Sequence, residues 1–191
     1  MAVSKAKKSR ARKNQPSAPA RAPGRAPQSA LSHLDDDGRL TMVDVSAKPE
    51  SQRLAIARGL LRCSPATRAA LSSSTTSKKG EALVTAKVAG ILAAKQTGAL
   101  IPLCHPLALS DVAVDVSAVD AGFLIEARVS CVGRTGVEME ALVAVSVCGL
   151  TLYDMGKAME REMELTDVRL IEKRGGKSGL WRRDDDVPTR R

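Results

Sequence analysis

Two Ala-rich helical segments on either side of a pair of strand-like segments constrain the fold more than any other feature of this sequence. Residues 107–119 alternate between apolar and polar side chains, which is typical of a half-buried strand. A turn with a glycine follows, and residues 123–133 are the expected return strand of a hairpin. Helices are expected over residues 80–97, closed by a glycine cap at Gly98, and over residues 137–163.

Further elements are expected outside this unit. Residues 40–45 are predicted to be a short strand and residues 168–173 the last strand. Residues 53–62 are apolar with a mixed period, so a strand and a helix both remain open there. Ser64 followed by Pro65 predicts the start of a short helix, because serine is favoured as a cap and proline at the first helical position.

The order of these elements contains a βαββαβ series. That order packs as an antiparallel sheet with helices on one face, so the expected class is α+β with a ferredoxin-like arrangement. Both long helical segments are apolar over more than one face. This predicts a second apolar contact, most simply with another subunit.

Charge divides the chain of 191 residues into three parts. Of the net charge of +9, +8 falls in residues 1–29, which leaves +1 for the rest. This first part is a basic Ala/Pro-rich tail that is expected to be disordered, because it has too little apolar surface to bury. Residues 30–181 are the expected domain, and residues 182–191 are a charged C-terminal tail.

Composition excludes several classes of protein. No uncharged apolar run approaches the roughly 18–20 residues that span a bilayer, so no membrane partner is expected. One Phe, one Tyr and one Trp are too few for base-stacking platforms, so no specific nucleic-acid partner is expected. The cysteines form no CxxC pair, which gives no sign of a metal site. The N-terminus lacks the apolar segment of a secretory signal, so a cytoplasmic location is expected.

Two segments carry possible chemistry, each with a structural alternative. His105 lies between Pro102 and Pro106, which stiffen the backbone, and is either a site residue or a hydrogen-bonded structural histidine. Glu138 and Glu140 begin the second long helical segment. Paired acids there can bind the N–H edge of a guanine-like ring or transfer a proton. Alternatively, they can simply complement the helix dipole.

Two lysine-containing segments offer further chemistry. Asp154 and Lys157 face the same way on a helix, as an acid–base couple or as a surface ion pair. Lys78 and Lys79 precede Gly80 at a helix start, where ammonium groups and free N–H groups could bind phosphate. The spacing of a P-loop is absent. Other cations are available at Arg53, Arg134, Lys173, Arg174 and Lys177.

Taken together, these segments resemble one family. They occur in order as MVDVSAK (42–48), KG (79–80), AGI (89–91), LIPLCHPL (100–107), TGVEMEAL (135–142), LYDMGK (152–157) and KRGGKSG (173–179). The chain resembles the molybdenum cofactor biosynthesis protein C family over about residues 31–180. LIPLCHPL and TGVEMEAL are highly specific to that family.

The resemblance implies a lyase of molybdenum cofactor (molybdopterin) biosynthesis. The implied reaction converts (8S)-3′,8-cyclo-7,8-dihydroguanosine 5′-triphosphate, a small-molecule substrate, into cyclic pyranopterin monophosphate and diphosphate. The implied assembly is a homohexamer built as a trimer of dimers. The reaction calls for no redox cofactor, and the sequence has no cofactor motif. Proton shuttling would be supplied by lysines with depressed pKa and by a carboxylate.

The resemblance also implies residue roles, carried over by matching motif. Asp154 is the implied catalytic acid–base residue, with Lys157 beside it, and Lys79 is the implied catalytic or phosphate-binding lysine. The implied substrate contacts come from two motifs and one arginine: Leu103, Cys104, His105, Glu138, Met139, Glu140 and Arg53. This chain has Ser77-Lys78 where many members carry histidines.

Helix geometry adds one expectation. If residues 137–163 form one helix, Glu140 and Asp154 lie about 21 Å apart, at about 1.5 Å per residue. One reacting centre cannot contact both from the same chain. A site at a subunit interface, with Asp154 from one chain and Glu140 from the next, is therefore expected.

Two other classes of function remain open. A small nucleic-acid-binding protein would use the basic tail and would lose binding when residues 1–29 are removed, whereas a synthase would keep its turnover. A catalytically silent ferredoxin-like regulatory domain is the other alternative. Such a domain would not need one set of residues that this chain retains: Lys79, His105, Glu140, Asp154 and Lys157.

Overall fold

The computed structural model describes residues 33–35, 37–73 and 82–184. The predictions for the tail at residues 1–29, and for Lys78 and Lys79, lie outside the described residues. Among those described, the helices and strands follow in this order: β1 (Ser51–Arg62), α1 (Pro65–Ser72), α2 (Ala82–Lys95), α3 (Thr97–Leu100), β2 (Leu109–Val119), β3 (Gly122–Gly133), α4 (Glu138–Gly156), β4 (Glu164–Arg174) and β5 (Trp181–Arg182).

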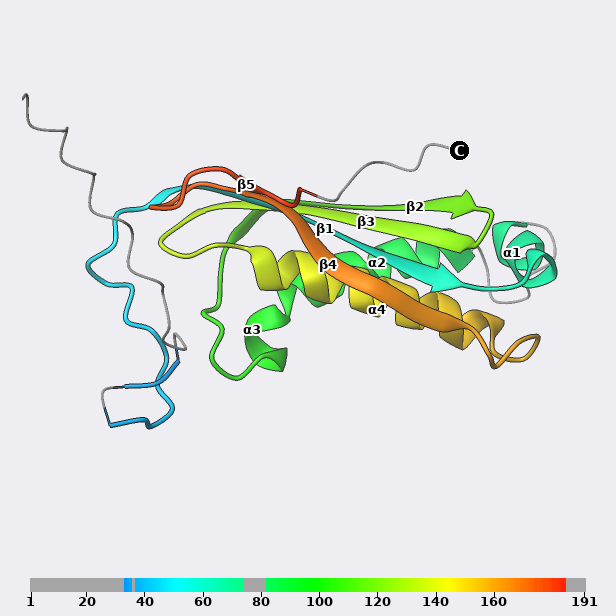
Figure 1. The fold of residues 1–191 in the computed structure, drawn as a ribbon, viewed down its shortest axis with the longest axis horizontal. Helices are drawn as coiled ribbons and strands as arrows, with labels where there is room; N and C mark the ends of the chain where they lie inside the picture. The colour runs from blue at the N-terminus through cyan, green and yellow to red at the C-terminus, as the bar shows by residue number, and fades with distance from the viewer. Residues whose placement is uncertain (1–32, 36, 74–81, 185–191) are drawn as a thin grey trace, which may run out of the picture. The chain divides into compact units, whose positions relative to one another are not determined.

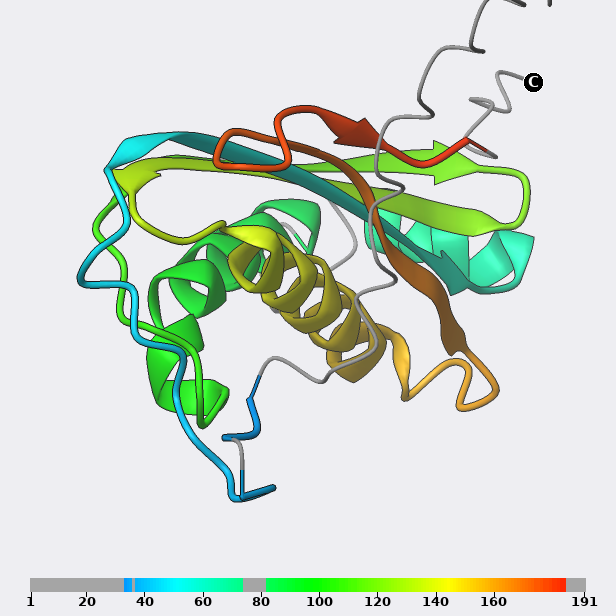
Figure 2. The same ribbon diagram turned by 60° about the vertical axis from the view of Figure 1, so that its left-hand side comes forward.

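The strands form one antiparallel sheet in the order β2-β3-β1-β4-β5. α2 and α4 lie side by side across one face of this sheet (Figure 1), and Figure 2 shows the same layering from another side. The first four strands have the ferredoxin-like order, and β5 adds a short edge. The predicted α+β class and ferredoxin-like arrangement are confirmed.

Small residues let α4 lie close to its neighbours. A Cβ atom on Gly59 of β1 would lie 2.7 Å from a methyl carbon of Val145. A Cβ on Gly90 of α2 would lie 2.8 Å from the backbone oxygen of Ala144. Because protein interiors are close-packed, these contacts fix the position of α4 against both the sheet and α2.

The core lies between the sheet and the two long helices. Every second residue of β1 from Ala55 to Leu61 is buried, and these positions pair with buried positions of β3 between Phe123 and Val129. α4 contributes Ala141, Ala144, Val145, Cys148 and Leu152 to the same core.

Several local predictions are confirmed. The hairpin forms as β2 and β3, and residues 53–62 lie in a strand, β1. Ser64 caps α1, since its side-chain oxygen accepts a hydrogen bond from the Thr67 N–H at 3.3 Å, and Pro65 opens the helix.

Three local predictions are wrong. Residues 40–45 are not a strand, and only an isolated bridge joins Leu34 and Leu40 in this region of the described chain. Gly98 does not cap α2, which ends at Lys95, but lies within α3. The helix predicted for residues 137–163 ends at Gly156, because the chain turns there toward β4.

α4 is the one helix, among the residues described, that is long and apolar enough to span a membrane by length and composition. Half of its most apolar window is buried inside the fold. Such burial is usual for the core helix of a folded domain, so the length and composition of α4 are weak evidence for a membrane span.

Candidate functional site

A pocket of about 360 Å³ lies at the N-terminal end of α4. Its lining combines apolar groups with two carboxylates, one lysine and two histidines: His33, Val43, Val45, Lys48, Leu103, Cys104, His105, Leu107, Thr135, Gly136, Glu138, Met139 and Glu140. Mostly apolar pockets of about 300–1,000 Å³ with a few convergent polar groups are typical of small-molecule sites. The pocket joins LIPLCHPL and TGVEMEAL, which are far apart in the sequence.

The segment that carries His105 is held against α3. A Cβ on Gly98 would lie 3.1 Å from the Cα of Pro106, a tight contact, so the glycine eases the close approach of the two backbones. Beside His105, the Cys104 N–H donates to the Ile101 oxygen at 3.0 Å. Burial raises the pKa of the Cys104 thiol, and Glu140 adds to the rise. Cys104 is therefore a neutral thiol at neutral pH.

The two carboxylates that open α4 have different environments. Glu138 accepts a hydrogen bond from the Lys173 ammonium of β4 at 2.7 Å, so its charge has a direct partner. Glu140 is 4% exposed. Burial raises the pKa of Glu140, and the nearby Glu138 charge adds to the rise. The pair thus offers one carboxylate held by a lysine and one, Glu140, that takes up a proton more readily than an exposed glutamate.

Gly136 shapes the turn before α4. A Cβ on Gly136 would lie 1.8 Å from a carboxylate oxygen of Glu138. The helix begins without a side-chain cap at Val137. Its first-turn N–H groups and both acids are thus gathered at the pocket, where the helix dipole favours negative charge.

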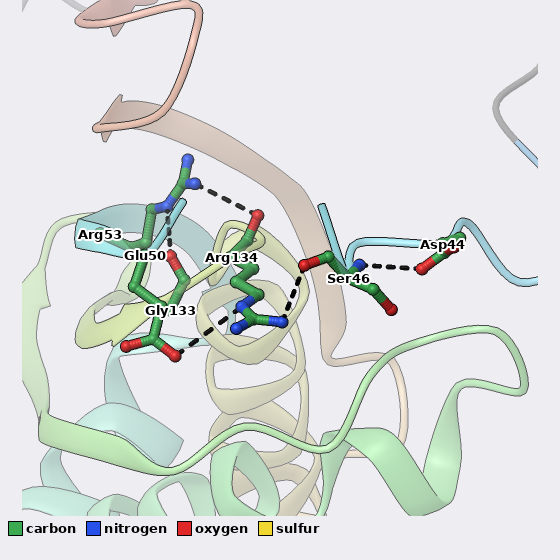
Figure 3. Close-up of polar contacts among 6 residues, drawn as sticks. All are labelled: Asp44, Ser46, Glu50, Arg53, Gly133 and Arg134. Carbon is green, nitrogen blue, oxygen red and sulfur yellow. Dashed lines mark hydrogen bonds and ion pairs between the residues drawn. The ribbon is translucent and has the colours of Figure 1, made fainter. Parts of the chain in front are cut away.

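Arg53 lies where β1 and the end of β3 come together (Figure 3). Its Nε donates to the Gly133 oxygen at 3.1 Å, and its Nη2 donates to the Arg134 oxygen at 3.2 Å. A Cβ on Gly176 would lie 1.8 Å from Arg53 Nη1, so the turn after β4 packs directly on this guanidinium. Arg53 thus contacts two other parts of the chain, the end of β3 and the turn after β4, but does not line the pocket.

Asp154 and Lys157 form an ion pair at the other end of α4, with 2.7 Å between Lys157 Nζ and Asp154 Oδ1. Both side chains are more than half exposed. The hydrogen bond to Asp154 raises the pKa of Lys157, so its ammonium is protonated at neutral pH. The pKa of Lys157 is thus set by its neighbour, and its direction is upward rather than the depression expected of proton-shuttling lysines.

The turn after α4 is fixed on both sides. The Tyr153 hydroxyl donates to the Arg161 oxygen at 3.0 Å, and Glu160 accepts the Ser64 N–H at 2.9 Å. These hydrogen bonds fix the turn that contains Lys157.

The structure therefore separates the predicted residues into two groups. Six of them line one pocket: Leu103, Cys104, His105, Glu138, Met139 and Glu140. Asp154 and Lys157 lie at the far end of the same helix, two residues before its last residue and one residue after it. Asp154 comes 14 residues after Glu140. At about 1.5 Å per residue, this spacing corresponds to about 21 Å.

Sequence reasoning gave no role to several lining residues, among them His33, Val43, Val45 and Lys48. Three of these lie in or beside the motif MVDVSAK, which carried part of the family resemblance. Lys48, the lysine of that motif, was the residue from which the sequence could have predicted a further part of the site. No three His, Cys, Asp or Glu side chains in the described parts of the chain lie close enough together to hold a metal ion.

Comparison with known proteins matches these features to one family. The family model described as the MoaC family matches residues 42–176. A cyclic pyranopterin monophosphate synthase from Thermomicrobium roseum is 54% identical over 158 residues, which are 82% of this chain and 95% of the relative. One from Novosphingobium aromaticivorans is 54% identical over 152 residues, 80% of this chain and 96% of the relative.

A third relative of the same name, from Syntrophomonas wolfei, is 50% identical over 156 residues, which are 81% of this chain and 99% of the relative. The family match covers both motifs that form the pocket and both ends of α4. The chain belongs to the MoaC family.

Proposed function

We propose that the chain acts as a cyclic pyranopterin monophosphate synthase of molybdenum cofactor biosynthesis. It is a lyase that converts (8S)-3′,8-cyclo-7,8-dihydroguanosine 5′-triphosphate into cyclic pyranopterin monophosphate and diphosphate. One observation carries this proposal: LIPLCHPL and TGVEMEAL, the two most specific motifs, meet in a single pocket of small-molecule size. The names of three relatives at 50–54% identity support the same activity.

The pocket end of α4 binds the substrate. Glu140 and Met139 line the same pocket as His105 and its neighbours, Leu103 and Cys104. A buried carboxylate beside backbone N–H groups can hold the N–H edge of a guanine-derived ring. Glu138 keeps its partner Lys173, and Arg53, held against the end of β3, is the proposed cation for phosphate.

The far end of α4 carries the acid–base chemistry. Asp154 accepts a proton as a carboxylate, and Lys157, which is protonated at neutral pH, supplies one as an ammonium. Formation of the cyclic phosphate requires a substrate hydroxyl to lose its proton and attack the α-phosphorus. The bond from that phosphorus to the diphosphate then breaks, and cations stabilise the diphosphate as it leaves. Lys79 is the third catalytic residue in this proposal.

Both ends of α4 are required, yet they are about 21 Å apart in one chain. The proposed site is therefore shared, with Asp154 from one subunit and Glu140 from the next, in a hexamer built as a trimer of dimers. Exposed apolar side chains on the helix layer support a subunit contact. They are Val84, Val88 and Leu92 on α2 and Leu150 on α4, each at least half exposed.

The first experiment measures turnover of enzymatically prepared 3′,8-cyclo-7,8-dihydro-GTP in a reducing buffer at neutral pH. Turnover is followed as release of diphosphate and, after oxidation, as fluorescent pterin. Asp154→Ala is expected to lose at least about 100-fold in kcat. Asp115→Ala is the matched control, since Asp115 also forms an exposed pair with a lysine, Lys87, at 3.3 Å. Absence of turnover by folded wild-type protein would overturn the proposal.

A second experiment tests the shared site. Inactive Asp154→Ala and inactive Glu140→Ala proteins are mixed under conditions in which subunits exchange. Hybrid assemblies then contain some sites with both wild-type residues, so activity is expected to return. If exchange is demonstrated by mass spectrometry and activity stays absent, each site is built from one chain.

A further inference from the structure

The turn after α4 is attached to another helix of the same chain. α1 lies near the end of α4 (Figure 1). Glu160, a half-buried residue of this turn, binds Ser64, the N-cap of α1. Glu160 Oε2 accepts the Ser64 N–H at 2.9 Å and the Ser64 hydroxyl at 2.8 Å, and Oε1 lies 3.1 Å from the same Ser64 nitrogen. One carboxylate thus joins the turn to the start of α1.

The α1 side of this attachment is itself held in place. The Ser64 hydroxyl oxygen accepts the Thr67 N–H at 3.3 Å, and the two side-chain oxygens lie 3.1 Å apart. Thr67 is buried. Hydrogen bonds from Thr67 and then from Ser64 lower the pKa of Glu160, so Glu160 is a carboxylate at neutral pH. Because hydrogen bonds to a charged acceptor are the strong ones, the pair of Glu160 and Ser64, called the clamp below, is a firm attachment.

The clamp acts on a short turn that begins with Lys157. The Tyr153 oxygen accepts the Lys157 N–H at 2.8 Å, and the Gly156 oxygen accepts the Glu160 N–H at 3.2 Å. At the other end of the turn Met163 is buried, and a Cβ on Gly156 would lie 2.9 Å from its terminal methyl carbon. Lys157 and Glu160 therefore belong to one tightly bonded unit. Fixing Glu160 in place fixes the backbone of Lys157.

Lys157 depends on such a fixed backbone for a physical reason. Its ammonium is carried by a flexible four-carbon stem, and helix ends have few partners for their last carbonyl groups. The contact of 2.7 Å with Asp154 is more than half exposed, and exposed ion pairs contribute little to holding a segment. A misplacement of about 1 Å at a catalytic group can cost about 100-fold in rate. Accurate placement of Lys157 must therefore come from the turn.

We propose that Glu160 is a positioning residue for the acid–base reaction: by binding Ser64 it holds the turn in which the Lys157 ammonium lies beside the Asp154 carboxylate. This inference rests on the function proposed above, in which that pair carries the acid–base chemistry. Glu160 acts through Lys157 and not by contact with the substrate. Its loss therefore slows the chemical step more than it weakens substrate binding, which the other end of α4 supplies.

The first test compares kcat and KM in variants of the full chain. Glu160→Ala is expected to lower kcat about 10-fold with KM within about 2-fold of wild type. Glu160→Gln should keep kcat within about 3-fold, because the amide oxygen can still accept the Ser64 N–H. Glu160→Asp keeps the charge on a shorter side chain that falls short of Ser64. It should resemble Glu160→Ala, and it provides the same test if the alanine variant does not fold.

Two controls separate positioning from a general loss of stability. Arg68 also attaches α1, but to the hairpin: its Nη1 donates to the Asp120 oxygen at 2.8 Å. Arg68→Ala should lower the melting temperature as much as Glu160→Ala does, with kcat unchanged. Glu162→Ala removes an exposed glutamate of the same turn and should change neither quantity. A fall in kcat for Arg68→Ala equal to that for Glu160→Ala would overturn the inference.

Hydrogen exchange distinguishes failure of this inference from failure of the proposed function, because it needs no turnover. Exchange of the Lys157 N–H is expected to speed up about 10-fold in Glu160→Ala and to stay within about 2-fold of wild type in Arg68→Ala. If the wild type does not turn over the cyclised nucleotide but this difference is found, the clamp holds Lys157 and the proposed function is wrong. If exchange is unchanged in Glu160→Ala, or if KM rises and kcat does not fall, the inference is overturned.

Discussion

The Glu172 carboxylate is nearly buried on the sheet, while its cationic partner Arg182 stays largely in solvent, with side-chain exposures of 4% and 63%. Arg182 Nε donates to Glu172 Oε2 at 2.8 Å, and Arg174 Nε donates to Oε1 at 2.5 Å. Hydrogen bonds from Arg182, and then from Arg174, lower the pKa of Glu172. The short strand β5 is thereby attached to β4, and the sequence-based boundary between residues 181 and 182 falls inside it.

Glu172→Gln is expected to lower the free energy of unfolding at pH 7 by about 1–3 kcal/mol. The folded-state pKa of Glu172 lies below its unfolded value, so this stabilisation is complete above the unfolded pKa and disappears as pH falls through the folded pKa. Urea unfolding at pH 7 and pH 3 should therefore show a difference from wild type that shrinks in acid. Glu162→Gln, an exposed glutamate, is the control. A difference independent of pH contradicts this account.

Gly176→Ala is expected to disturb Arg53. The new Cβ would fall 1.8 Å from Arg53 Nη1, and φ at this residue is +70°. Gly179→Ala provides a close control, because its φ is +62° but nothing lies within 4 Å of the added Cβ. Both substitutions carry about 1–2 kcal/mol of backbone strain. Only Gly176→Ala should raise KM for the cyclised nucleotide, by about 10-fold as for a lost charged hydrogen bond. Equal kinetic effects in both variants would count against a role for Arg53.

Gly90→Ala is expected to destabilise the fold although alanine is the better helix former. The added Cβ would lie 2.8 Å from the Ala144 backbone oxygen, which cannot move without shifting α4. The expected loss is about 1–3 kcal/mol. Gly149→Ala meets the tip of the Leu165 side chain at 2.6 Å, and that tip can rotate away. Thermal unfolding should therefore show a larger loss for Gly90→Ala, and the reverse order would refute the packing argument.

Glu140→Gln is expected to change stability and activity in opposite directions. Its pKa is raised by burial, so the ionised carboxylate lowers stability as pH rises from the unfolded pKa through the folded pKa. The neutral amide removes this cost, so the variant should be more stable than wild type at pH 8 and about equal at pH 4. Turnover should fall about 10–100-fold if Glu140 contacts the substrate.

Glu138→Gln is the comparison for that variant, because it breaks the ion pair with Lys173 and should not stabilise the protein. Melting temperatures at the two pH values and kcat/KM for both variants complete the measurement. Lower stability of Glu140→Gln at pH 8 would show that the ionised carboxylate is not a cost to the fold.

Thiol labelling should distinguish the four cysteines, all of which are free. Burial raises the pKa of Cys148 to about 12, and Cys131 is also buried with a raised pKa. Cys63 and Cys104 are only half-buried. A disulfide reagent at pH 8 should therefore label Cys63 and Cys104 first, and the other two only after unfolding. Early labelling of Cys148, identified by peptide mapping, would contradict the structure.

Features that depend on local pattern were predictable from the sequence. The alternation in β2 and the cap at Ser64 need only neighbouring residues to be recognised, and both occur as expected. The mixed period of residues 53–62 has a physical origin. β1 is a central strand, buried on the helix face and half-covered on the other, so its apolar residues do not alternate with polar ones.

Features that depend on distant contacts were not predictable in the same way. The alternation near Val43 and Val45 looked like a strand, but these side chains line the pocket instead of a sheet. Residues 43–50 are held by a hydrogen bond from Arg134, 88 residues after Ser46, to the Ser46 oxygen, and no local sequence pattern predicts such a contact. The motifs themselves identified six lining residues. Resemblance to a family can indicate that distant residues share a site, whereas hydrophobic periodicity describes only local structure.

The length of α4 has a consequence for how this chain can vary. Glu140 and Asp154 belong to one uninterrupted helix, Glu138–Gly156, so their separation and relative direction are set by the number of residues between them. Inserting or deleting one residue there would rotate one end against the other by about 100° and shift it by about 1.5 Å. A substitution on the exposed side of this helix leaves the two ends aligned, whereas a change in the number of its residues would misalign them.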